Sequence, residues 1–197
     1  FVELNLNTLT IYWNLIYINA IFDFIDRLIN FHPYAAYTKL QNPYFEKKIK
    51  KSRTKFGAIF IKTKMITKTV EENKAANRKS LYGLLSDQSP QLHKTHYWAY
   101  FLGVKVPVIT GSEMLAKKHD LIIVNYNARK VKRGYYEIDF EVITDSPSDF
   151  KDYEITDKYL KLTEEHIRKQ PEFYLWSHKR FKHKDKYDEW LKKQKKA

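Results

Sequence analysis

Two charged residues stand where an α/β fold could use them for chemistry. Asp87 closely follows residues 81–85 (LYGLL), a continuous apolar run typical of a strand buried on both faces of a parallel sheet. Arg53 stands at the edge of the apolar stripe of a lysine-rich helical segment. Ligands gather beyond the carboxyl ends of such strands, and an arginine at the edge of a buried face can hold a phosphate or carboxylate. A salt bridge between the two that only joins helix to sheet accounts for the same pattern.

A second cluster, near the carboxyl end of the chain, combines cations with aromatic rings. Its members are Trp176, His178, Lys179, Arg180, Phe181 and Lys182. The combination suits a lipid headgroup interface or a phosphorylated saccharide. Packing is the alternative, in which Tyr174, Trp176 and Phe181 seal the core while the cations stay solvated.

Other histidines carry weaker signals. His183 is followed five residues later by Asp188, and a carboxylate that contacts an imidazole can orient it as a base. The pair lies in a charged segment, and a chain with seven histidines and 23 acidic residues yields about one such match by chance. His93 and His96 could suggest a metal, but no cysteine or further histidine stands at ligand spacing. We therefore expect no metal and no cofactor.

Composition limits the partners. The 197 residues suffice for one α/β core, and a net charge of +13 attracts nucleic acid, an anionic lipid surface or a phosphorylated substrate. Lysine greatly outnumbers arginine, which favours phosphates and headgroups over planar base recognition, although an A+T-rich genome explains the same excess. Polar residues interrupt the apolar region 9–31, so no membrane span is expected there and the chain is peripheral at most.

Local patterns predict alternating strands and helices. Strands are expected at 34–38, 58–61 (buried), 81–85, 121–124 and 135–142, and helices at 43–55, 67–78 and 110–118. Asn42 should cap the first helix and Gly57 end it, and Thr110 and Glu113 have the spacing of a capping box. The fold class is therefore α/β, with a central mostly parallel or mixed sheet flanked by helices.

The last part of the chain should form a long helix and then a tail. Ile155, Tyr159, Leu162 and His166 fall on one stripe of the helix, which stops at Pro171. The lysine-rich segment after Tyr187 is predicted to be frayed and solvated.

Six segments together resemble the bacterial lipid A biosynthesis acyltransferases. They are RTKFG at 53–57, SDQSP at 86–90, HYW at 96–98, TGSEMLAKK at 110–118, KVKRGYYEIDFE at 130–141 and PEFYLWSHKRFKHK at 171–184. The resemblance extends from about residue 32 to 184 and implies a glycerol-phosphate-acyltransferase-like fold. It implies a single acyltransferase domain over residues 1–184, with 1–30 divergent or frameshifted and 185–197 a basic tail.

The resemblance also implies a reaction. Such an enzyme moves a fatty acyl chain from acyl carrier protein to a hydroxyl of a lipid A precursor, at the cytoplasmic face of the bacterial inner membrane. Arg53 and Asp87 match residues associated with the family's active site, and Trp176, His178, Lys179 and Arg180 are expected to bind substrate. The expected partners are acyl carrier protein, the lipid A precursor and an anionic membrane surface, which the chain meets peripherally or through an anchor upstream of Phe1. No nucleic acid is expected.

The family's catalytic pair, a histidine followed five residues later by Asp or Glu, would fall near residues 9–22. No histidine precedes His32. A shifted reading frame or sequence error before about Asn30, an inactive relative, and a motif upstream of Phe1 each explain this. We favour the first because the resemblance is lost abruptly. The alternative functions are an inactive family member and a basic nucleic-acid-binding domain, although no helix-turn-helix, RNP or zinc-finger pattern is present.

Overall fold

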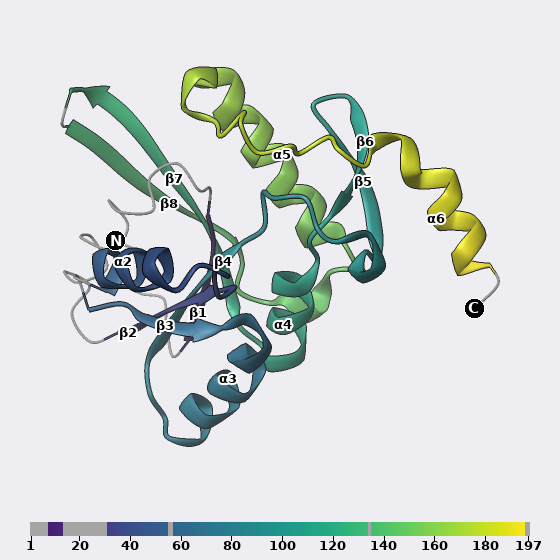
Figure 1. Cartoon of the computed structure of the whole chain (residues 1–197). Helices are drawn as coiled ribbons and strands as arrows, with labels where there is room; N and C mark the ends of the chain where they lie inside the picture. Colours follow the sequence, from purple (N-terminus) through teal and green to yellow (C-terminus); the bar gives the residue numbers. More distant parts are fainter. Residues whose placement is uncertain (1–7, 14–30, 55–56, 134, 196–197) are drawn as a thin grey trace.

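A six-stranded mixed sheet forms the centre of the protein (Figure 1). The computed structural model describes residues 8–13, 31–54, 57–133 and 135–195, and the side chains of residues 8–13 and of Arg53 lie outside that description. The elements are β1 (Thr8–Trp13), β2 (His32–Tyr37), α2 (Pro43–Arg53), β3 (Ile59–Lys62), α3 (Ile66–Ala75), β4 (Ser80–Leu85), β5 (Tyr97–Phe101), β6 (Val104–Val108), α4 (Gly111–His119), β7 (Ile122–Lys132), β8 (Tyr135–Thr144), α5 (Glu154–Lys169) and α6 (Tyr187–Gln194).

The strand order is β3-β2-β4-β1-β7-β8, with every neighbouring pair parallel except β7 and β8. This confirms the predicted mostly parallel or mixed sheet. The apolar run at 81–85 is interior strand β4, which is buried along nearly its whole length. Residues 59–61 of the run at 58–61 lie in β3, which is an edge strand with Ile59 exposed, so the prediction of a buried strand is wrong there.

Asn42 starts α2 as predicted. Its side-chain oxygen accepts hydrogen bonds from the backbone N–H of Tyr44 (3.0 Å) and Phe45 (3.3 Å). The helix ends at Arg53, where Thr54 is the C-cap and donates its hydroxyl to the carbonyl of Lys50. Gly57, the predicted C-cap, instead turns the chain toward β3 with a φ of +77°, a conformation that glycine adopts without strain.

Helices α3, α4 and α5 and the β5–β6 hairpin contribute to one large apolar cluster with the sheet. Val70, Leu115 and Tyr159 pack there with residues of β2, β4 and β7 such as Tyr82. The buried positions of α5 are Ile155, Thr156, Tyr159, Leu160, Thr163 and Ile167. The predicted stripe is therefore rotated, because Leu162 and His166 are only half-buried.

The β5–β6 hairpin was not among the predicted elements. Leu102 and Gly103, both with positive φ, form its two-residue turn. The backbone N–H of Leu102 donates to the carboxylate of Glu164 (2.8 Å), and the ring of Tyr97 stacks on that of Tyr153 with centroids 4.3 Å apart. These contacts fix the hairpin against α5.

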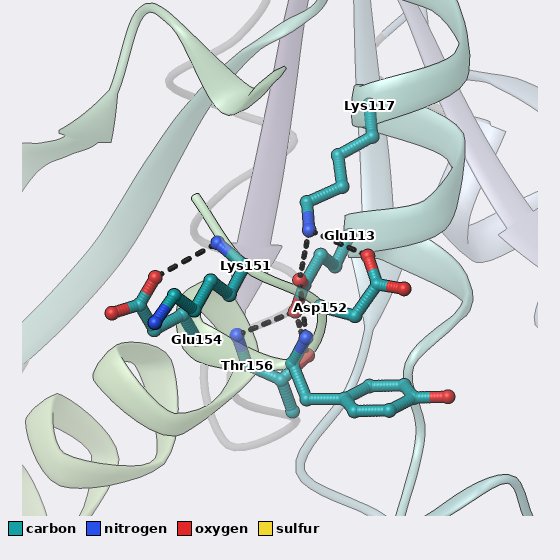
Figure 2. A network of polar contacts seen from close by, with 7 residues as sticks. Glu113, Lys117, Lys151, Asp152, Glu154 and Thr156 are labelled. Atoms are coloured by element: carbon teal, nitrogen blue, oxygen red, sulfur yellow. Dashed lines mark hydrogen bonds and ion pairs between the residues drawn. The ribbon is translucent and has the colours of Figure 1, made fainter. Parts of the chain in front are cut away.

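Glu113 joins α4 to α5 (Figure 2). Its side chain is 0% exposed and accepts hydrogen bonds from the backbone N–H of Tyr153 (2.7 Å) and from the N–H (2.8 Å) and hydroxyl (2.6 Å) of Thr156. Lys117 lies 3.1 Å from it and 2.9 Å from Asp152. The predicted capping box is wrong, since the Thr110 side chain makes no cap bond and Glu113 instead binds donors at the start of α5.

The lysine-rich end is also ordered, contrary to the prediction of a frayed tail. It forms α6, in which Trp190 donates its indole N–H to the carbonyl of Thr95 (3.1 Å) and packs with Tyr187 against Trp98. Lys105 lies over the ring of Tyr187, 3.3 Å from its centroid. Aromatic residues three apart hold the helix while its lysines face solvent.

No helix within the described ranges is both long and apolar enough to cross a bilayer. The apolar region 9–31, for which the sequence predicts no span, lies largely outside those ranges.

Replacing Glu113 with alanine should lower the free energy of unfolding by about 3–5 kcal/mol, because it leaves the donors of Tyr153 and Thr156 unsatisfied and leaves Lys117 with only the exposed Asp152 as a partner. Urea unfolding followed by circular dichroism measures the loss. The matched control is Glu72→Ala, which removes an exposed ion pair with Lys68 and should cost less than about 1 kcal/mol. Similar losses in the two variants would show that the buried network does not join the helices.

Candidate active site

A cleft of about 780 Å³ opens at the carboxyl edge of the parallel strands. The ends of β2 and β4, the first turn of α4 and residues of α2 and α3 form its walls. Its apolar lining consists of Ala35, Ala36, Leu40, Ile49, Phe60, Ile66, Leu84, Leu85, Ile109, Met114 and Leu115. Lys50, Lys118 and Glu46 are its charged residues within the described part of the chain. The cleft can hold a ligand that has both an apolar chain and an anionic group.

The loop after β4, residues 86–89, forms the polar edge of this region. The hydroxyls of Ser86 and Ser112 share a buried hydrogen bond of 2.8 Å, which ties the loop to the first turn of α4. Ser89 donates its backbone N–H to Nε2 of His178 (2.9 Å). Gln88, between these anchors, lines the cleft. The loop is thus fixed at both ends, and Gln88 is a site residue that the sequence analysis missed.

Asp87 lies just past the carboxyl end of β4, as expected from the sequence, but it does not line the cleft. It is buried, and it interacts electrostatically with Tyr174 and Arg180. Burial, the neighbouring Asp87 charge and the smaller opposing effect of Arg180 bring the pKa of Tyr174 to about 12. The carboxylate of Asp87 therefore faces the protein core and not the cleft.

Arg180 is a core residue that is 1% exposed. Its Nη1 donates to the carbonyl of Pro107 (2.8 Å), and its guanidinium lies over the ring of Phe101, 5.3 Å from the centroid. Within the described part of the chain, Nε and Nη2 have no hydrogen-bond partner. Burial lowers the pKa of Arg180, and Tyr174 and Asp87 oppose that effect. The structure places the guanidinium of Arg180 near Asp87. The side chain of Arg53, the partner expected from the sequence, lies outside the described residues.

The rest of the aromatic and basic cluster is divided between surface and interior. Trp176 is exposed and donates its indole N–H to the carbonyl of Pro171, and Lys179 is exposed. Tyr174 is buried, and the ring of Phe181 stacks on Phe101. The structure therefore brings His178 and Arg180 to the loop of Asp87 and leaves Trp176 and Lys179 at the surface.

The other histidine signals receive no supporting geometry. His183 precedes α6 and Asp188 lies in its first turn, away from the residues that line the cleft. In the described ranges, no group of three or more His, Cys, Asp or Glu residues could hold a metal ion. His93 and His96 therefore belong to no such group. The region in which the catalytic pair was expected lies outside the described residues, except for the backbone of β1.

The hydrogen bond from Ser89 to His178 requires an unprotonated Nε2. Burial, followed by Lys182 and Arg180, holds the pKa of His178 below its ordinary value of 6.5. The unfolded chain therefore takes up this proton first as the pH falls, so the stabilisation is complete above pH 6.5 and is lost as the pH falls through the folded-state pKa.

Between about pH 7.5 and pH 5, the free energy of unfolding should fall by about 1 kcal/mol more in the unsubstituted protein than in His178→Gln, which does not titrate. Urea titrations at each pH measure the difference. Because the other histidines are common to both proteins, their contributions cancel. Parallel pH profiles would contradict the role assigned to His178.

None of the curated proteins compared with the chain matches it. A family model described as bacterial lipid A biosynthesis acyltransferase matches residues 30–183, well over half of the sequence, and confirms the resemblance carried by the motifs. The chain therefore belongs to the bacterial lipid A biosynthesis acyltransferase family.

Proposed function

We propose that this chain transfers a fatty acyl chain from acyl carrier protein to a hydroxyl of a lipid A precursor at the cytoplasmic face of the inner membrane. One observation supports the proposal most directly: the cleft at the carboxyl edge of the sheet combines a long apolar lining with cations. Its volume of about 780 Å³ falls within the range of about 300–1,000 Å³ that is usual for ligand sites.

The apolar lining suits the acyl chain. Leu84 and Leu85 come from the end of β4, and Ile109, Met114 and Leu115 belong to α4 or the residues just before it. An acyl chain laid along these side chains would leave water, a transfer worth about 0.8 kcal/mol for each buried methylene group. The length of the apolar lining would therefore set the length of acyl chain that the cleft accepts.

The charged residues suit the anionic parts of both substrates. Lys50 and Lys118 line the cleft, and the first turn of α4, at Gly111 and Ser112, contributes the partial positive charge of a helix N-terminus. Phosphates of a donor arm or of a lipid A precursor carry the opposite charge. Gln88 offers an uncharged donor and acceptor between the anchored ends of its loop.

The backbone also suggests where a catalytic base would act. The last residue of β1, Trp13, pairs in register with Leu85 at the end of β4, so the chain leaves β1 at the cleft edge. We propose that the family's catalytic pair belongs at this edge, after β1, where this chain carries no histidine before His32. Arg53 and Asp87 remain our proposed active-site residues, with Asp87 acting by positioning the loop of Gln88.

A thin-layer assay with acyl-loaded carrier protein and a lipid A precursor tests the proposal, together with a direct measurement of carrier binding. Transfer supports an active enzyme. Binding without transfer supports the inactive family member, and inserting a histidine and an acidic residue five apart after β1 should then restore turnover. Absence of both, with tight nucleic-acid binding in a filter assay, would favour the nucleic-acid-binding alternative.

Met114→Trp should lower kcat/KM for long-chain donors by about 5- to 150-fold, because the larger side chain enters the acyl cleft. If turnover is absent, donor affinity should fall instead. Met65→Trp is the matched control, since Met65 is the chain's other methionine, is also exposed and does not line the cleft. Equal effects of the two substitutions would contradict an acyl chain in this cleft.

The affinity for acyl carrier protein, and turnover with it, should fall about tenfold between roughly 50 and 500 mM NaCl, because salt screens the attraction between a chain of net charge +13 and an acidic carrier. Isothermal titration over a salt series measures the change. An uncharged osmolyte of equal osmolality is the control, and a flat salt series would refute the electrostatic account.

A further inference from the structure

Strands β7 and β8 form a two-stranded ribbon that extends past the rest of the sheet, as the green arm in Figure 1 shows. Among the described residues, β1 pairs with β7 as far as Asn125, whereas β7 continues to Lys132. At about 3.3 Å per residue, the overhang reaches roughly 20 Å beyond the end of that pairing. Since β7 runs parallel to β1 and β4, the free end of the ribbon lies on the side of the sheet where the cleft opens.

The free end of the ribbon combines exposed apolar side chains with cations. Val131 is 55% exposed, Tyr135 60% and Tyr136 44%. Lys132 and Arg133 are also exposed, and the ammonium of Lys132 lies over the ring of Tyr135, 4.1 Å from its centroid. Residues 130–136 contain three cations and no carboxylate. We name Lys130, Val131, Lys132, Arg133, Tyr135 and Tyr136 the ribbon tip.

Contacts with the body of the protein hold the ribbon at the base of this tip. The backbone N–H of Lys130 donates to the side-chain oxygen of Gln170 (3.3 Å), whose amide donates back to the Lys130 carbonyl (3.1 Å). Arg129 and Glu137 form a cross-strand ion pair, so this carboxylate is neutralised next to the tip. The ribbon tip is therefore presented in a defined direction from the end of α5.

We propose that the ribbon tip docks the protein on an anionic lipid bilayer, with Val131 and the tyrosines in the headgroup region and Lys132 and Arg133 against lipid phosphates. Exposed apolar and tyrosine side chains gain by entering a bilayer interface, and neighbouring cations add attraction to anionic lipids. Docked in this way, the carboxyl edge of the sheet faces the membrane. The docking proposal rests on the proposed function, because in that function the cleft takes its lipid substrate from a bilayer.

Vesicle co-sedimentation tests the docking without any acyl transfer. The whole chain should bind vesicles of phosphatidylethanolamine with phosphatidylglycerol, and bind phosphatidylcholine vesicles much more weakly. Lys132→Gln with Arg133→Gln should weaken binding about 25-fold, at about fivefold for each cation. The matched control, Lys192→Gln with Lys195→Gln, removes two exposed cations of the carboxyl-terminal segment and should change binding less than about threefold.

Insertion of the apolar side chains has its own measurement. Because the chain contains no cysteine, Tyr135→Cys can be labelled at a single site with an environment-sensitive dye. Its emission should shift to the blue on anionic vesicles. The same dye at Tyr100→Cys, which is equally exposed on the β5–β6 hairpin, should not shift.

The proposal is overturned if the tip variants bind vesicles as the unsubstituted protein does, if both labelled sites respond alike, or if the chain binds nucleic acid but no vesicles. Acyl transfer to a detergent-dispersed precursor separates this failure from failure of the proposed function. Tip variants that lose vesicle binding but keep transfer in detergent support docking, and vesicle binding by a chain that never transfers acyl groups leaves docking supported alone.

Discussion

Parallel strand pairing is the constraint on which the rest of the structure depends. Because β2, β4, β1 and β7 all run in one direction, each of them ends at the same edge, and the segments that follow β2 and β4 meet there. The first turn of α4 comes to the same edge through the bond between Ser86 and Ser112. The apolar cleft and its cations are a consequence of this shared direction, since residues from six elements (β2, α2, β3, α3, β4 and α4) can line it only if those elements converge.

Buried polar groups then set the positions of the helices and loops around the sheet. Glu113 accepts three hydrogen bonds from the start of α5 and pairs with Lys117, which satisfies a carboxylate that burial would otherwise penalise. Arg180 has one strong bond, to Pro107, and receives electrostatic compensation from Asp87 and Tyr174. Both charges lie where separate elements meet, so they favour one relative placement of those elements over others.

The sequence predicted best what local pattern controls. The apolar run of β4, the Asn42 cap and the stop at Pro171 depend on neighbours in the chain, and all three are confirmed. Contacts between distant residues were not predictable in this way. Thr110 and Glu113 match a capping box locally, yet the donors that satisfy Glu113 lie 40 residues away, as the bond from Tyr153 shows. Gln88 could have been suspected only from its place in the loop after a buried strand. The packing of Tyr187 and Trp190 in α6 was missed because the many lysines around them are typical of a solvated segment.

The docking of α6 has a practical consequence for anyone who shortens this protein. Trp98 and the carbonyl of Thr95 are covered by Trp190 and Tyr187, although composition alone would mark that segment as dispensable. A truncation before α6 would expose the indole ring of Trp98 and uncover this side of the β5–β6 hairpin. The exposed aromatic surface would promote aggregation. Fragments designed for expression should keep α6. Poor solubility of a shorter fragment would reflect the loss of this helix rather than a misfolded sheet.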